Sequence, residues 1–126
     1  MQREATPKMV LVVEDNELNM KLFQDLLEMG GYNVLRAQEV AQALELTRRH
    51  RPDLIVLDIQ LPGASGLELA KWIKGDDALK AIPILAVTAL ALKGDEQKIR
   101  AAGCDGYVSK PIRMASFLEV VGQFFR

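Results

Sequence analysis

The sequence has few of the side chains that form disulfides or bind soft metals. Cys104 is the only cysteine and His50 the only histidine among 126 residues, so an internal disulfide and a cysteine-based zinc site are excluded. Glycine-containing pairs flank Cys104 and predict a turn with a structural thiol. His50 lies among basic residues ahead of Pro52, which is typical of the solvated end of a helix. Any bound metal must therefore be held by oxygen atoms.

A strong net charge and a long apolar segment are also missing. The 16 Lys and Arg residues nearly balance the 17 Asp and Glu residues, so the total charge does not favour nucleic acid or anionic lipid as a partner. No segment approaches the roughly 20 apolar residues that span a bilayer, and residues 1–7 do not resemble a signal peptide. We expect a cytoplasmic protein with no nucleic-acid or membrane partner, in which residues 1–7 are a disordered extension and residues 8–126 form one domain.

Five apolar segments alternate with five segments of helical periodicity along the chain. The expected strands are Met9–Val13, Asn33–Ala37, 54–57, 82–87 and Gly106–Ser109. The expected helices are 16–29, 39–49, 65–74, 91–102 and 114–125. This alternation predicts a parallel sheet with right-handed crossovers and helices on both faces. The polar second strand suits a sheet edge, as in a flavodoxin-like (βα)5 three-layer sandwich of strand order 2-1-3-4-5.

Polar side chains follow four of the five expected strands: Glu14 with Asp15, Asp58, Thr88 and Lys110. In an open parallel sheet, ligands bind outside the carboxyl ends of the strands, near the point where the strand order reverses. Carboxylates that gather there cannot all stay ionised unless a cation compensates them. A few oxygen ligands with open positions suit Mg²⁺ better than Ca²⁺, so we expect a magnesium site.

The same residues could carry phosphoryl transfer. A carboxylate beside Mg²⁺ can attack a phosphoryl group to form an aspartyl phosphate. Asp58 is the candidate nucleophile because it ends the most buried strand, whereas Glu14 and Asp15 form a metal-holding pair. Lys110 and Thr88 would neutralise and orient the phosphoryl oxygens.

Each of these residues also has a simpler explanation. An acidic pair ahead of a helix commonly caps that helix, and either Asp15 or Asn16 could do so. A threonine at a strand end and a Lys-Pro step, here a candidate for a cis peptide, are weak signals by themselves. Their joint occurrence at the ends of neighbouring strands favours a functional site.

Over nearly its full length the sequence resembles the receiver domains of two-component response regulators. The matching segments are 13–16, 52–63, 87–89 and 103–111. Within that family, residues 14–28 and 93–96 most resemble single-domain regulators of cell division, from which the chain departs at Gly30-Gly31, Leu90, Leu92 and residues 1–7.

The resemblance implies a role for each residue of the expected site. Asp58 is the implied phosphoacceptor, and Thr88 and Lys110 contact the phosphate. The implied Mg²⁺ ligands are Asp15, Asp58 and the Gln60 carbonyl, with Glu14 acting directly or through water. Tyr107 is the implied switch aromatic, which turns inward when Thr88 is drawn to the phosphate.

The function that the resemblance implies is that of a single-domain response regulator in a phosphorelay. A sensor histidine kinase or histidine phosphotransferase would phosphorylate Asp58. The output would be binding of a downstream protein through the fourth helix, the fifth strand and the fifth helix, because the chain ends just after that helix. Such a protein is not an enzyme beyond the phosphorylation and dephosphorylation of its own Asp58.

Three other classes of protein fit these residues less well. A small Mg²⁺-dependent aspartyl-phosphate hydrolase would use a second Asp two residues after the nucleophile, where this chain has Gln60. A nucleotide- or flavin-binding module is disfavoured by the acidic residues 14–17 and by the lack of a glycine-rich phosphate loop. An adaptor that is never phosphorylated is disfavoured because every active position is filled.

Overall fold

The computed structural model describes residues 7–61, 66–89 and 93–125. Strands and helices alternate through them in the order β1 (Met9–Val13), α1 (Glu17–Met29), β2 (Asn33–Ala37), α2 (Val40–His50), β3 (Leu54–Asp58), α3 (Gly66–Lys74), β4 (Ile84–Thr88), α4 (Lys93–Ala101), β5 (Gly106–Ser109) and α5 (Met114–Gln123). The strands pair in parallel in the order β2-β1-β3-β4-β5. The predicted fold and strand order are confirmed.

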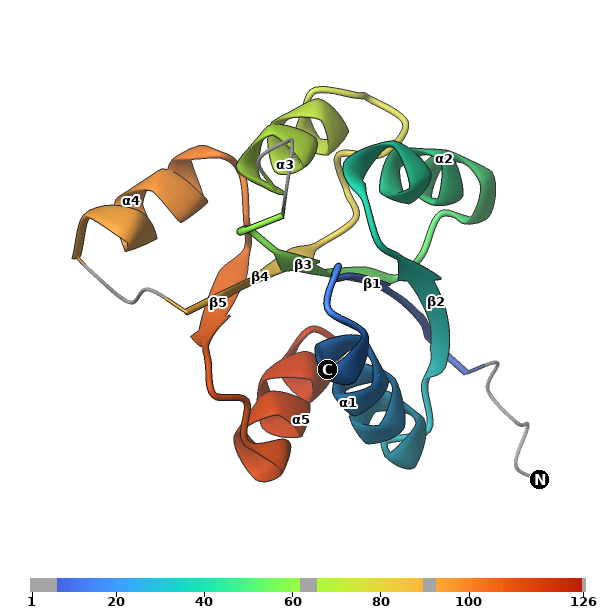
Figure 1. The fold of residues 1–126 in the computed structure, drawn as a ribbon. Coiled ribbons are helices and arrows are strands. Elements are labelled where there is room, and N and C mark those ends of the chain that lie inside the picture. The colour runs from blue at the N-terminus through green and yellow to red at the C-terminus, as the bar shows by residue number, and fades with distance from the viewer. Residues whose placement is uncertain (1–6, 62–65, 90–92, 126) are drawn as a thin grey trace.

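Helices cover both faces of the sheet, with α1 and α5 on one side and α2, α3 and α4 on the other (Figure 1). Successive residues of a strand point to opposite faces, so alternate residues of β1 enter two separate cores. Leu11 and Val13 pack under the three-helix side, and Val10 and Val12 pack under α1 and α5. Every residue of β3 is buried, because both of its faces are covered.

The edge position of β2 agrees with its composition. Asn33 and Arg36 are exposed, and only Ala37 of this strand is fully buried. The single cysteine, Cys104, is buried, and burial with the neighbouring Asp105 raises the pKa of its thiol to about 11. The single histidine, His50, is exposed at the end of α2. Both side chains lie as predicted, and within the described residues neither belongs to a group of three or more potential metal ligands.

Several predicted boundaries were wrong by one or two residues. β4 begins at Ile84 rather than at residue 82, because Pro83 has no N–H to donate and contributes only its carbonyl, which accepts from Ile55 N–H at 3.0 Å. α2 begins after Glu39, which is its N-cap. α5 ends at Gln123, where the chain closes in a tight turn with Phe125 N–H bonded to Gly122 O.

Other predicted boundaries meet the edges of the described segments. α3 begins at Gly66 and α4 at Lys93, and the predicted starts of these helices at residues 65 and 91 lie outside the described residues, as does nearly all of the expected 1–7 extension. Among the helices that the structure describes, none is both long and apolar enough to cross a membrane.

Candidate functional site

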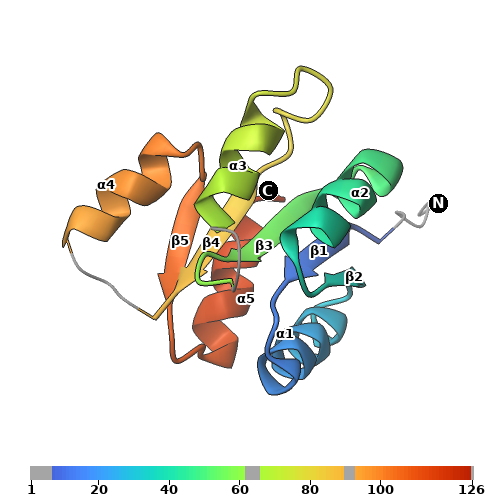
Figure 2. The same ribbon diagram turned by 45° about the horizontal axis from the view of Figure 1, so that its top comes forward.

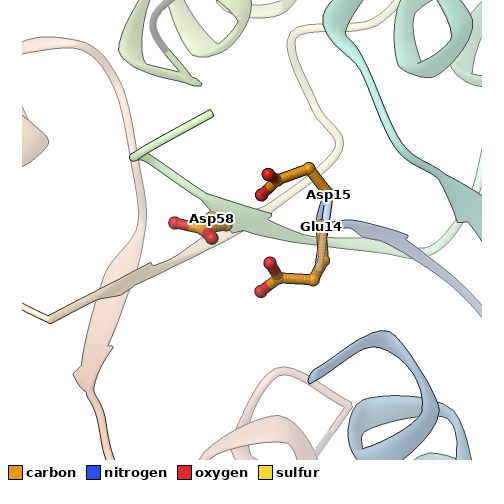
Figure 3. Close-up of side chains that lie close together, drawn as sticks. All are labelled: Glu14, Asp15 and Asp58. Atoms are coloured by element: carbon orange, nitrogen blue, oxygen red, sulfur yellow. The ribbon is translucent and has the colours of Figure 1, made fainter. Parts of the chain in front are cut away.

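Three carboxylates meet at the carboxyl ends of β1 and β3. Glu14 and Asp15 follow β1 directly, and Glu14 N–H donates to Ala37 O at 2.9 Å, which carries the strand pairing one residue past β1. Asp58 is the last residue of the neighbouring β3. Figure 3 shows the carboxylates of Glu14 and Asp15 directed towards that of Asp58. One oxygen from each group lies within 4.8 Å of the others, so the expected acidic cluster is present in the fold.

The three carboxylates differ in their access to solvent. Glu14 is 1% exposed and Asp58 3% exposed, whereas Asp15 is exposed. Asn16 rather than Asp15 caps α1, with its side chain accepting from Asn19 N–H at 2.9 Å. This choice leaves the Asp15 carboxylate available to the cluster.

Backbone N–H groups donate hydrogen bonds to only some of the oxygen atoms of the two buried carboxylates. Gln60 N–H donates to Asp58 Oδ1 at 2.9 Å, and Asn16 N–H donates to Glu14 Oε2 at 3.1 Å. Glu14 Oε1 is buried and accepts no hydrogen bond from the described residues. An unsatisfied buried oxygen of this kind costs about 1–3 kcal/mol. The arrangement therefore fits a cation that supplies the missing interaction.

Lys110 is the cation that the chain itself brings to the cluster. Its backbone N–H donates to Thr88 O at 2.8 Å, which holds it beside the end of β4, and the peptide bond to Pro111 is cis. Its Nζ atom lies 3.3 Å from Asp58 Oδ2 and 3.6 Å from Glu14 Oε1. Thr88, the last residue of β4, is also buried. One ammonium group thus faces two buried carboxylates.

Burial of the cluster raises the pKa of Glu14 from an ordinary 4.5 to about 7. Burial is the main cause, and the neighbouring Asp58 adds to it. The hydrogen bond from Asn16 N–H and the charge of Lys110 act in the opposite direction without cancelling the rise. The buried position of Glu14 therefore favours its protonated form, and a cation bound beside it would favour the ionised form instead.

Two further features of the site were not predicted. The Gln60 side chain bridges two loops, with its Oε1 accepting from Ala89 N–H at 3.2 Å. A Cβ atom on Gly66 would lie 2.6 Å from Asp58 O and 2.7 Å from Ile59 Cα, so only glycine lets α3 start this close to the strand. The sequence pattern indicated a turn near this point but not that the first residue of α3 must be glycine.

Tyr107 lies away from the acidic cluster, on the side of β5 that packs against α4. Its ring is half-buried against the core under α2, α3 and α4, and its hydroxyl donates to Glu96 Oε1 at 3.2 Å. Glu96 Oε2 in turn pairs with Arg100 Nε at 3.3 Å. In this structure the hydroxyl of Tyr107 is therefore hydrogen-bonded to an exposed side chain of α4.

The strand order reverses between β1 and β3, and acidic side chains gather at that point beside Lys110. This arrangement is the architecture of a receiver domain. The sequence profile of the response regulator receiver domain matches residues 10–122, and the chain belongs to this family. Receiver domains are in general signalling proteins rather than enzymes.

Individual relatives agree with this assignment. The chain is 57% identical over 118 residues to the polar-differentiation response regulator DivK of Brucella anthropi, covering 94% of this chain and 96% of that protein. This similarity supports the predicted subgroup of cell-division regulators.

Solved structures of other receivers superpose on nearly the whole chain. Chemotaxis protein CheY4 of Vibrio cholerae has a TM-score of 0.90 at 26% identity, covering 94% of this chain and 99% of that one. The receiver domain of sensor histidine kinase PA1611 from Pseudomonas aeruginosa has a TM-score of 0.87 at 30% identity, covering 94% and 98%, and its structure holds a magnesium ion in the active-site cleft.

Proposed function

We propose that this chain is a phosphorylation-dependent signalling switch whose Asp58 accepts a phosphoryl group from a sensor histidine kinase or a histidine phosphotransferase. The observation that carries the proposal is the convergence of Asp58, Glu14 and Asp15 within 4.8 Å beside the Lys110 ammonium. Membership of the receiver family supports it.

The residues present fit a magnesium ion. The ligands we propose are the carboxylates of Asp15 and Asp58 and the backbone carbonyl of Gln60, with Glu14 acting directly or through water. The buried Glu14 Oε1 accepts no hydrogen bond within the described residues, and its contact with Lys110 Nζ is 3.6 Å long, which supports a cation that interacts with it more closely. When bound, the ion would neutralise the negative charge that builds up as a carboxylate approaches a phosphoryl group.

The chain's own groups account for the transfer step. A carboxylate oxygen of Asp58 forms a bond to phosphorus while the bond from phosphorus to the donor's histidine nitrogen breaks, and the electron pair of that bond returns to the imidazole. Gln60 N–H fixes the orientation of the Asp58 carboxylate through Oδ1. Lys110 Nζ, 3.3 Å from Asp58 Oδ2, is placed to pair with a phosphoryl oxygen, and the Thr88 hydroxyl is proposed to donate to another.

The proposed readout passes through Thr88 and Tyr107 to the surface formed by α4, β5 and α5. If Thr88 moves towards the phosphoryl group, Tyr107 can turn inward, and its hydrogen bond to Glu96 must then break. The charge on Asp58 would thereby change the surface that a downstream protein contacts, which is a two-state change biased by a local electrostatic event.

The alternative, a magnesium-dependent aspartyl-phosphate hydrolase, lacks support at one decisive position. The residue two places after Asp58 is Gln60, whose amide cannot act as a general acid or base. Its side-chain oxygen instead accepts from Ala89 N–H. We therefore propose that turnover is limited to the phosphoryl group on Asp58 itself.

The test is incubation with acetyl phosphate and Mg²⁺, followed by intact-mass measurement. We expect the addition of one base-labile phosphoryl group to the wild-type chain and none to Asp58→Asn. Labelling of Asp58→Asn, or none of the wild type, would contradict the assignment. Steady turnover of p-nitrophenyl phosphate would favour the hydrolase instead.

A further inference from the structure

A shallow groove between α2 and α3 combines an exposed aromatic side chain with basic residues. Its lining is Leu44 and Arg48 from α2, Lys71 and Trp72 from α3, and Gly75 with Asp76 just after α3. The two helices lie side by side on the same face of the sheet (Figures 1 and 2). A second hollow continues along α2 through Ala41, Leu44 and Arg48. Leu44 and Arg48 thus belong to one extended surface.

Trp72 is the only tryptophan of the chain, and 52% of it is exposed. The buried face of α3 is formed by Leu69, Ala70 and Ile73, so Trp72 is not needed for the core on which α3 packs. A large aromatic ring on a helix surface, flanked by arginine and lysine, has the composition of an energetic centre of a protein interface.

The charges around Trp72 are not balanced within the chain. Among the described residues, neither Arg48 nor Lys71 has an ion-pair partner. Of the carboxylates nearby, Glu45 pairs with Arg49 at 3.0 Å, and Asp76, whose Oδ1 accepts from Ala78 N–H at 2.9 Å, is the one carboxylate in the lining of the groove. Two cations against one carboxylate give the groove a net positive charge beside an apolar surface, which is complementary to carboxylates on a partner.

The shape of the surface selects a helix as its occupant. Two packed helices offer ridges and grooves but no unpaired backbone groups, so an added strand would find no hydrogen-bond partners. A polyanion such as nucleic acid is a poor fit, because the groove has only two free cations and also contains Asp76.

The groove is remote from the acidic cluster. α3 starts at Gly66 against the Asp58 carbonyl, and Trp72 lies six residues further along, about 9 Å down the helix axis. Arg48 is likewise in the last turn of α2, close to the start of β3 rather than its carboxyl end. A protein bound in the groove would leave the carboxylates accessible.

We propose that the groove between α2 and α3 docks an acidic amphipathic helix of a partner protein, with an apolar side chain on Trp72 and Leu44 and carboxylates facing Arg48 and Lys71. The surface is separate from α4, β5 and α5, so it can hold a partner whether or not Asp58 is phosphorylated.

The experiment uses Trp72 as its own reporter. The probe is a synthetic helical peptide without tryptophan, with leucine at positions i, i+3, i+4 and i+7 and glutamate on both flanks of that stripe. We expect saturable, salt-sensitive quenching or a blue shift of Trp72 emission. Lys71→Glu together with Arg48→Glu should weaken binding about tenfold or more. The matched control, Lys98→Glu, removes an exposed cation from α4 and should leave the affinity unchanged.

Three results would overturn the proposal. The first is no change of emission up to about 1 mM peptide. The second is equal binding of a peptide in which lysine replaces every glutamate. The third is a dimer in sedimentation that Trp72→Ala converts to a monomer, which would make a second copy of the chain the occupant. Because Trp72 is exposed, we expect circular dichroism to show Trp72→Ala folded, and Lys71→Glu repeats the test without touching the ring.

Discussion

Replacing Glu14 by glutamine should stabilise the metal-free protein at alkaline pH. The buried carboxyl has a pKa of about 7 in the folded chain against an ordinary value of 4.5, so the folded state holds its proton more tightly than the unfolded state does. The stability linked to that proton is fully present below about pH 4.5 and is lost as the pH rises through about 7. Above that range, ionised Glu14 lowers the free energy of unfolding by roughly 3 kcal/mol relative to a neutral group.

Glutamine keeps the size of the side chain and an oxygen that can accept from Asn16 N–H, and its amide N–H₂ can donate to Asp58. Some of the gain is lost with the attraction to Lys110, whose Nζ lies 3.6 Å from Glu14 Oε1. We therefore expect the free energy of unfolding of Glu14→Gln to exceed that of the wild type by about 1–3 kcal/mol at about pH 8. Near pH 4 the two values should agree within about 0.5 kcal/mol.

The assay is urea denaturation in the presence of EDTA at several pH values, repeated with excess Mg²⁺. Magnesium should stabilise the wild type and have much less effect on Glu14→Gln, because one of its proposed partners is gone. The control is Glu45→Gln, which alters an exposed carboxylate paired with Arg49 and should show neither trend. A difference between wild type and Glu14→Gln that does not grow between about pH 5 and about pH 8 would refute the reasoning from burial.

Two further substitutions test the neighbours of Asp58. Lys110→Ala should slow phosphorylation of Asp58 by at least about tenfold, measured by intact mass. The free energy of unfolding should fall by only about 1–2 kcal/mol, since the ammonium is partly exposed. Loss of the fold would instead give Lys110 a mainly structural role. Gly66→Ala should destabilise the domain by about 1–3 kcal/mol in urea, because its Cβ would lie 2.6 Å from Asp58 O. Gly122→Ala in α5 is the control, with no atom within 4 Å of the new Cβ, and should be neutral or stabilising.

The strand pattern predicted the fold well because the buried sheet leaves little freedom. Four consecutive apolar residues ending at Asp58 require a strand covered on both faces, and the structure buries every residue of β3. The parallel arrangement then brings strand ends together, so residues far apart in the sequence, Glu14, Asp58 and Lys110, could be expected at one edge. The predicted start of β4 was two residues too early, since an apolar run does not reveal that the strand begins only after Pro83, which has no N–H to donate.

The finer features depend on three-dimensional surroundings that a pattern does not contain. Glu14 and Asp15 are adjacent and chemically alike, yet Glu14, which still pairs with β2 through Ala37 O, is buried, and Asp15, at the bend before α1, is exposed. The raised pKa of Glu14 follows from that burial and could not be read from its position in the sequence. Trp72 is similar, since only the packing of α3 through Leu69 and Ile73 shows that the ring faces solvent.

The acidic cluster and the groove at Trp72 share one physical feature, which is charge that the chain leaves uncompensated. At the carboxyl edge, three carboxylates cluster and Lys110 pairs with two of them, and the buried Glu14 Oε1 accepts no hydrogen bond among the described residues. On the outer face of α2 and α3, two cations flank an exposed ring without a carboxylate partner in the described part of the chain. The two places differ in what this costs, because the buried carboxylates oppose folding when ionised, whereas the solvated cations beside Trp72 cost little and act through complementarity to a partner. We propose binding at both places, of a divalent cation and a phosphoryl group at one and of an acidic helix at the other, and the variants that test each place leave the residues of the other unchanged.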